Sequence, residues 1–130
     1  MLGIIRKSKM SNADTERNGI QAVIEYEKQQ GRTDVRRVQK TGFDLITKGQ
    51  GEERHIEVKT TDKSRFTFRW LEQMEYDALK NDLHFYLYLV TNANDPASRR
   101  IWIYDQKRTM DRYSGEIKHY NFVFPRQDFE

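Results

Sequence analysis

At 130 residues the chain has the length of one domain, and a composition of 36% hydrophobic and 33% charged residues predicts a thin core built largely on seven Phe, seven Tyr and two Trp. The absence of Cys excludes disulfides, thiolate metal sites and cysteine nucleophiles, and it fits a reducing cytoplasm. The net charge of +3 is too small by itself to indicate nucleic-acid binding.

The first half of the chain is predicted to form a helix and three short strands. Residues 12–31 carry apolar side chains at helical spacing, with Asn12 or Asp14 as the N-terminal cap and Gly31 as the stop. Runs rich in β-branched and apolar residues follow, and they predict strands at 34–38, 42–47 and 54–61.

The second half adds a helix and at least two strands. The run "FTFRW" is a short strand candidate before an amphipathic helix at 71–82, and the nearly continuous apolar run at 84–92 indicates a buried strand. A strand is predicted at 99–105 and a last candidate at 117–125. The core order is therefore αβββαββ, an α/β fold in a single domain over residues 1–130.

The two ends of the chain are expected to lie outside this core. Residues 1–11 are predicted to be a flexible N-terminal segment and residues 106–130 a C-terminal extension. No stretch approaches the roughly 18 apolar residues of a membrane span, so a soluble, cytoplasmic protein without a membrane partner is expected.

The stretch "GFDLITKGQGEERHIEVKTT", residues 42–61, has the pattern of a β-hairpin that carries chemistry. Ile56 and Val58 alternate with Glu57 and Lys59, so the charged pair shares one face, about 7 Å apart along the strand. Asp44 lies 13 residues before Glu57, across a turn at Gly49 to Gly51.

Two carboxylates and a backbone carbonyl make a partial shell for Mg²⁺, which prefers hard oxygen ligands and keeps several waters. Asp44, Glu57 and the carbonyl of Val58 could supply it, while Lys59 could hold a water and stabilise charge on a phosphate. Alternating acid and base on a strand is also common as a solvated pair, so the pattern by itself leaves both interpretations open.

The chain also resembles a known family. The Gly-Phe-Asp run at 42–44, the Ile-Glu-Val-Lys run at 56–59 and the Tyr-Leu-Tyr-Leu-Val run at 86–90 are similar to the C-terminal domain of the plant NO VEIN proteins, which also stands beside many prokaryotic helicases. That family is a branch of the PD-(D/E)XK nuclease superfamily, which includes restriction endonucleases, repair nucleases and junction resolvases. The resemblance covers about residues 16–105.

The resemblance implies a restriction-endonuclease-like core, with a central mixed β-sheet flanked by helices. It implies that Asp44 and Glu57 bind a divalent cation, Mg²⁺ or Mn²⁺, and that Lys59 is the catalytic lysine. Many relatives add an acid from the first helix. Helical phase puts Glu16 and Glu27 nearer the core than Glu25, and Glu16 is the favoured helper.

The helix at 71–82 carries Gln73, Glu75 and Tyr76, residue types that some of these nucleases place beside the active site. Their register selects none of them, and they are not included among the predicted catalytic residues. Basic residues cluster around the hairpin and are the candidates for DNA contacts; they are Arg36, Arg37, Lys40, Lys63, Arg65 and Arg69.

The predicted function is a metal-dependent endonuclease or exonuclease that hydrolyses phosphodiester bonds in DNA, in defence, repair or recombination. The alternative is a non-cleaving, nuclease-derived module that binds DNA or protein beside a helicase-like partner. A helicase-like or defence-system protein and a second copy of the chain are the expected protein partners, since the many aromatic residues leave room for a covered surface.

Overall fold

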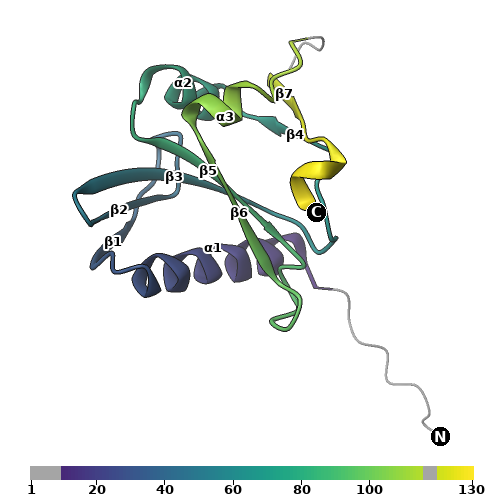
Figure 1. The fold of residues 1–130 in the computed structure, drawn as a ribbon, viewed down its shortest axis with the longest axis horizontal. Coiled ribbons are helices and arrows are strands. Elements are labelled where there is room, and N and C mark those ends of the chain that lie inside the picture. The colour runs from purple at the N-terminus through teal and green to yellow at the C-terminus, as the bar shows by residue number, and fades with distance from the viewer. Residues whose placement is uncertain (1–9, 116–119) are drawn as a thin grey trace, which may run out of the picture.

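The computed structural model describes residues 10–115 and 120–130, so most of the predicted flexible segment at 1–11 lies outside the described residues. Figure 1 shows the arrangement of the helices and strands. In chain order they are α1 (Asn12–Gln29), β1 (Asp34–Arg37), β2 (Leu45–Gly49), β3 (Glu52–Thr60), β4 (Phe68–Leu71), α2 (Gln73–Asn81), β5 (Phe85–Thr91), β6 (Arg100–Asp105), α3 (Gln106–Met110), β7 (Tyr120–Val123) and the 3₁₀ helix η1 (Arg126–Phe129).

Five strands form a mixed sheet in the order β1-β2-β3-β5-β6, and β4 pairs with β7 in a separate two-stranded sheet. Strands β3 and β5 are parallel, while the β1–β2, β2–β3 and β5–β6 pairs are antiparallel. Figure 1 shows α1 along one side of the large sheet, with α2 and α3 on the other. The predicted α/β fold with a central mixed sheet flanked by helices is confirmed.

The two faces of the sheet bury two apolar clusters. On the α1 side, Ile56 and Val58 of β3 pack with Val23 and Tyr88. On the other side, the cluster holds Leu79 of α2 together with the buried aromatic and aliphatic residues Phe66, Leu71, Phe85, Leu87, Leu89, Tyr104, Phe122 and Phe124. The alternation predicted for β3 is therefore confirmed, and Glu57 and Lys59 are directed away from the α1 side.

Helix α1 lies unusually close to β3. A Cβ atom built at Gly19 would stand 1.8 Å from the Thr60 methyl carbon, so only glycine permits this helix–strand distance. The cap differs from the prediction, because the Ser11 hydroxyl, rather than Asn12 or Asp14, accepts the hydrogen bond from the Asp14 amide. A serine one residue before the helix satisfies the same exposed amide that the other candidates would.

The sequence pattern did not predict α3 and η1. Helix α3 begins directly after β6, where Asp105 caps it through the Arg108 amide, and its five residues are too few to show helical periodicity. The C-terminal residues pack into the fold, since Phe122 and Phe124 are both 1% exposed. Within the described ranges, no helix has both the length and the apolarity of a membrane span.

Candidate active site

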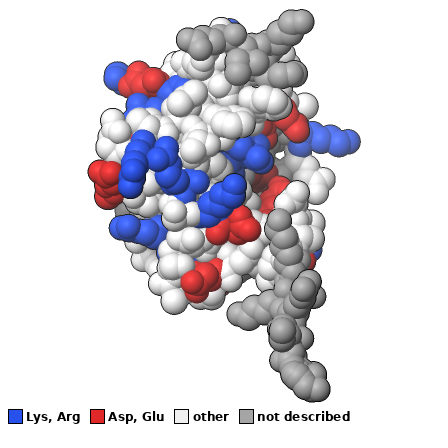
Figure 2. Space-filling model, turned by 90° about the vertical axis from the view of Figure 1, so that its right-hand side faces the viewer, with Lys and Arg blue, Asp and Glu red and all other residues white. Residues whose placement is uncertain are grey.

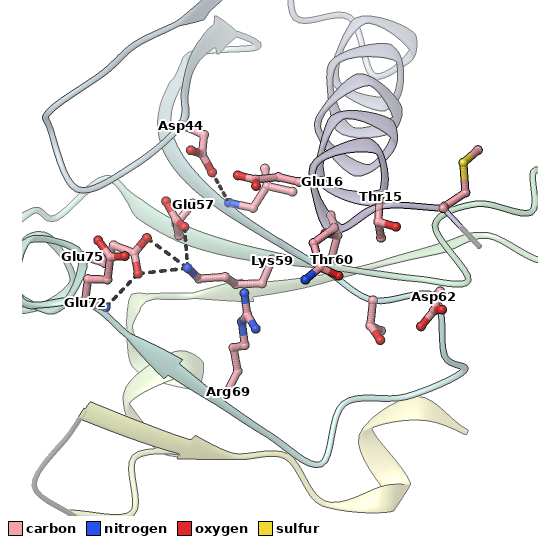
Figure 3. A pocket seen from close by; sticks show the side chains of 14 residues that line it. Thr15, Glu16, Asp44, Glu57, Lys59, Thr60, Asp62, Arg69, Glu72 and Glu75 are labelled. Carbon is pink, nitrogen blue, oxygen red and sulfur yellow. Dashed lines mark hydrogen bonds and ion pairs between the residues drawn. The ribbon is translucent and has the colours of Figure 1, made fainter. Parts of the chain in front are cut away.

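The hairpin of β2 and β3 holds Asp44 against the backbone of β3. Leu45 pairs with Ile56, and one residue earlier the Asp44 amide donates to the Ile56 carbonyl at 2.8 Å. The Asp44 carboxylate in turn accepts from the Val58 amide at 2.9 Å, as Figure 3 shows. Asp44 is thereby fixed beside the stretch of β3 that carries Glu57 and Lys59.

Gly42 brings this loop onto α2. Its φ is +85°, and a Cβ at this position would lie 2.3 Å from the Met74 carbonyl oxygen and 2.9 Å from the Ala78 methyl group. Both the left-handed backbone and the close contact exclude other residues. The glycine of the Gly-Phe-Asp run therefore sets the position of Asp44 relative to α2.

Lys59 joins two carboxylates from different elements. Its Nζ lies 3.1 Å from Glu57 Oε2 and 3.0 Å from each carboxylate oxygen of Glu75, the third residue of α2. Glu57 is 4% exposed and the Lys59 side chain 11% exposed. A buried ammonium held by two carboxylates is a fixed charge rather than a mobile surface lysine.

Burial and like charge dominate the electrostatics of the acids. Burial raises the pKa of Glu57 to about 10, and hydrogen bonding with Glu75 and the charge of Asp44 act in the same direction, against Lys59. Burial also raises the pKa of Asp44, although the hydrogen bond from the Val58 amide opposes the shift. The cluster has more buried carboxylates than cations and favours the arrival of a positive charge.

Lys59 and Glu75 are shifted toward their charged forms. Burial acts to lower the pKa of Lys59, but the charges of Glu57 and Glu75 outweigh it and the pKa is raised. Burial acts to raise the pKa of Glu75, but hydrogen bonding with Glu57 and the charge of Lys59 outweigh it and the pKa is lowered. Lys59 therefore stays protonated at neutral pH.

These residues line one polar cavity of about 490 Å³. One wall consists of Asp44, Glu57, Val58 and Lys59, and another of Glu75 of α2 with Glu72, the N-cap of that helix. The remaining lining residues come from the start of α1, the end of β3 and its following loop, and β4; they are Met10, Asn12, Thr15, Glu16, Thr60, Thr61, Asp62 and Arg69.

The three glutamates of α1 lie in different surroundings. Glu16 is exposed like Glu25, so the prediction that it lies nearer the core is not confirmed, but it lines the cavity from the α1 side. Glu25 is exposed and does not line this cavity. Glu27 is fully buried, and its carboxylate accepts from Thr47 and Tyr88, so it holds the fold together.

Glu75 is the site residue that the sequence pattern did not select. It is the third residue of α2, where its carboxylate accepts from the Glu72 amide at 2.9 Å in a capping box. That spacing predicts the start of a helix but not a contact with Lys59. Gln73 and Tyr76 point elsewhere, since Gln73 accepts from Tyr120 and Tyr76 stacks on the same ring.

The six predicted DNA-binding residues separate into two groups. Arg36 and Arg37 lie on the edge strand β1 and Lys40 in the following loop, whereas Lys63, Arg65 and Arg69 follow β3; of the six, only Arg69 lines the cavity. Figure 2 shows Lys and Arg side chains gathered over the middle of the face that includes the C-terminal end of the fold, with Asp and Glu side chains beside them.

A seventh basic residue, close in sequence to the first group, lies inside the protein. Arg32 stands four residues before Arg36, is 5% exposed and pairs with Glu27 and Glu52.

The predicted donor groups for a divalent cation are the Asp44 and Glu57 carboxylates and the Val58 carbonyl. In a strand, the amide and carbonyl of one residue point to the same edge, so the Val58 carbonyl points, like its amide, toward Asp44 beyond the start of β2. In the described part of the chain, no group of three or more His, Cys, Asp or Glu side chains is arranged to hold a metal ion. Water or substrate would have to complete the shell.

A family model described as "Protein NO VEIN, C-terminal" matches residues 15–103. The chain belongs to this family. The fold is also similar to the Holliday junction resolvase Hjc of Archaeoglobus fulgidus, with a TM-score of 0.61 and 12% identity over 88% of this chain and 86% of the resolvase. This family member therefore has a PD-(D/E)XK nuclease fold, as the sequence resemblance predicts. No curated protein sequence matches the chain.

Proposed function

We propose that this protein is a metal-dependent nuclease that hydrolyses phosphodiester bonds in DNA. The observation that carries the proposal is that Asp44, Glu57 and Lys59 line one cavity, with the Lys59 ammonium in contact with the Glu57 carboxylate. A solvated strand pair would leave Glu57 exposed, whereas this side chain is 4% exposed in a cluster that holds more carboxyl groups than cations. Such a burial cost is typical of a functional site.

The donor set fits Mg²⁺ or Mn²⁺. Asp44, Glu57 and the Val58 carbonyl would hold the ion through oxygen atoms only, the ligand type that hard cations prefer. When bound, the ion supplies an activated water and neutralises charge on the scissile phosphate. The buried, mutually repelling carboxylates of this cluster support such a binding role, because a cation offsets their desolvation.

The side chains around the expected metal position have separate roles. Lys59, held protonated by Glu57 and Glu75, donates hydrogen bonds to the attacking water or to a phosphate oxygen as negative charge develops there. Glu75 positions the Lys59 ammonium. Glu16 accepts a hydrogen bond from water on the α1 side of the cavity, and Arg69 contacts the phosphate from β4.

DNA is the proposed substrate because the fold is that of a nuclease superfamily and two cations, Lys59 and Arg69, line the cavity. The solved structure of similar fold is named as a Holliday junction resolvase, and we propose repair, recombination or defence as the setting for this chain. A helicase-like partner and a homodimer remain predictions.

Cleavage of supercoiled, linear, branched and single-stranded DNA in Mg²⁺, Mn²⁺ or chelator tests the proposal. We expect metal-dependent cleavage by the wild type. Lys59→Ala should lower the cleavage rate at least about 100-fold, as for removal of one preorganised charge-stabilising donor, and Lys28→Ala should leave the rate unchanged. Lys28 lies in the last turn of α1, at the opposite end from Glu16, and controls for loss of a lysine. Binding without cleavage in either metal would contradict the nuclease and favour the non-cleaving module.

A further inference from the structure

A second cavity opens beside the first. Its volume is about 520 Å³, in the range of pockets that hold small organic groups. The two cavities share Lys59, Arg69 and Glu72, so they are continuous along the start of α2. The second differs in character, because Trp70 and Tyr120 contribute aromatic surface where the first is lined by carboxylates and hydroxyls.

The aromatic surface continues outside the cavity. Phe68 and Trp70 alternate with Arg69 along β4, and Phe68 is opposite Val123 of β7. Phe68 is 56% exposed, Trp70 48% and Val123 47%. The ring centroids of Phe68 and Trp70 lie 6.1 Å apart. Arg69 makes no ion pair with any described residue, so its charge is available to a ligand at this edge of β4.

Tyr120 is held rigidly at the other side of the cavity. Its hydroxyl donates to the Gln73 side-chain carbonyl at 2.7 Å, and its ring stacks on Tyr76 with centroids 4.0 Å apart and planes 8° apart. A ring fixed in this way loses little conformational entropy when a planar group binds against it.

We propose that the second cavity holds the base of an unpaired nucleotide next to the phosphate bound in the first, and that the substrate is a DNA strand with at least one unpaired nucleotide. This inference rests on the proposed nuclease function. Bases inside a duplex already stack on their neighbours, whereas an unpaired base can place a face against Trp70 while Arg69 binds the adjoining phosphate. The juxtaposition of aromatic faces with Lys59 and Arg69 matches the alternation of bases and phosphates along one strand.

The same surface is poorly suited to a second copy of the chain. A stable protein interface buries about 800 Å² on each partner, and its centre is depleted of charged residues. Here three half-exposed apolar side chains adjoin a cavity lined by Lys59, Arg69 and Glu72. A nucleic acid strand matches both the apolar and the charged parts of this surface, through its bases and its phosphates.

Binding of three ligands in Ca²⁺ tests the inference, with the strands checked for integrity. They are a 12-nucleotide oligothymidylate, a 12-residue abasic strand with the same phosphates, and a 12-base-pair duplex. We expect the wild type to prefer oligothymidylate over both others. Trp70→Ala should weaken oligothymidylate binding roughly 5- to 100-fold, the range for loss of one stacked base, and leave abasic-strand binding unchanged.

Two further variants separate stacking from folding. Trp70→Phe keeps an aromatic face and should retain most of the preference, while Leu83→Ala, which removes a side chain that is 87% exposed and lines neither cavity, should bind like the wild type. Circular dichroism checks that each variant is folded.

The inference is overturned if the wild type binds oligothymidylate and the abasic strand equally, or if Trp70→Ala weakens both alike. It is also overturned if sedimentation shows a dimer that Trp70→Ala dissociates while base-dependent binding is unchanged, since the surface would then join two copies. Base-dependent binding without cleavage of any DNA would instead contradict the proposed nuclease function and still support the stacking site.

Discussion

Glu75 contributes both of its carboxylate oxygens to the Lys59 ammonium, and it is the part of the site supplied by α2. Replacing Glu75 by Gln keeps the side-chain shape but removes one of the two charges that hold Lys59. Glu75 is not itself an expected metal ligand, although it is hydrogen-bonded with the expected ligand Glu57. We therefore predict cleavage reduced about 10- to 100-fold with a smaller loss of Mn²⁺ affinity, as for other outer positioning residues.

Single-turnover cleavage and calorimetric Mn²⁺ titration measure the two effects of Glu75→Gln. Asp77→Asn is the matched control, because Asp77 lies on the same helix, is exposed, and bonds to Gln73 rather than to Lys59. Equal losses of metal affinity and cleavage in Glu75→Gln would make Glu75 a ligand instead of a positioning residue.

At the scale of the elements, the contact between the Gly42 loop and α2 sets the geometry of the site. Gly42→Ala places a methyl group against the Met74 carbonyl and strains a left-handed backbone, so we predict a loss of more than about 2 kcal/mol in the free energy of unfolding. Gly51→Ala isolates the backbone effect, because Gly51 has φ +77° but no atom within 4 Å of a built Cβ.

Urea unfolding of the Gly42 and Gly51 variants measures these costs. The Gly51 change should cost only about 1 kcal/mol, the price of left-handed alanine. Similar losses at both positions would mean that contact with α2 is unimportant for stability.

The C-terminal 3₁₀ helix is fixed by a partly buried ion pair between Asp128 and Arg112. The guanidinium donates to both Asp128 oxygens, at 2.7 and 2.9 Å, and these hydrogen bonds lower the pKa of Asp128 from its ordinary 3.8. A carboxyl group whose pKa is lower in the folded state stabilises the fold above its unfolded pKa, and the contribution disappears as the pH falls through the folded pKa.

Asp128→Asn should therefore cost about 1–3 kcal/mol in unfolding free energy at pH 7, and the difference from the wild type should shrink as the pH falls below about 4. Urea unfolding at a series of pH values measures this difference. A difference independent of pH would show that the charge of Asp128 contributes nothing.

Local pattern explains which of these features could be predicted from the sequence. The alternation of Ile56 and Val58 with Glu57 and Lys59, and the turn that returns the chain to Asp44, depend on neighbouring residues, so the hairpin wall of the cavity follows from the sequence. Glu75 reaches Lys59 only because α2 packs across the sheet, and no local spacing encodes that contact. Arg32 is close in sequence to exposed basic residues, and no local pattern predicts that it pairs with Glu27 and Glu52 in the folded protein.

Across the whole molecule, the expected DNA surface depends on charge and should respond to salt. Phosphate contacts release counterions, so the affinity for DNA should fall steeply as the salt concentration rises. We predict that Arg69→Ala lowers the slope of log K against log[salt] by about one, whereas Lys28→Ala at the far end of α1 leaves it unchanged. Fluorescence anisotropy over a salt series measures both, and equal slopes for Arg69→Ala and the wild type would remove Arg69 from the interface.

The central claim is that the β2–β3 hairpin forms a metal-dependent hydrolytic centre, and anomalous X-ray diffraction from crystals soaked in Mn²⁺ tests it most directly. We expect one anomalous peak within about 2.0–2.3 Å of oxygen atoms of Asp44, Glu57 and Val58, present in the wild type and Lys59→Ala and absent in Asp44→Ala. A peak located away from these atoms, or its persistence in Asp44→Ala, would contradict the claim.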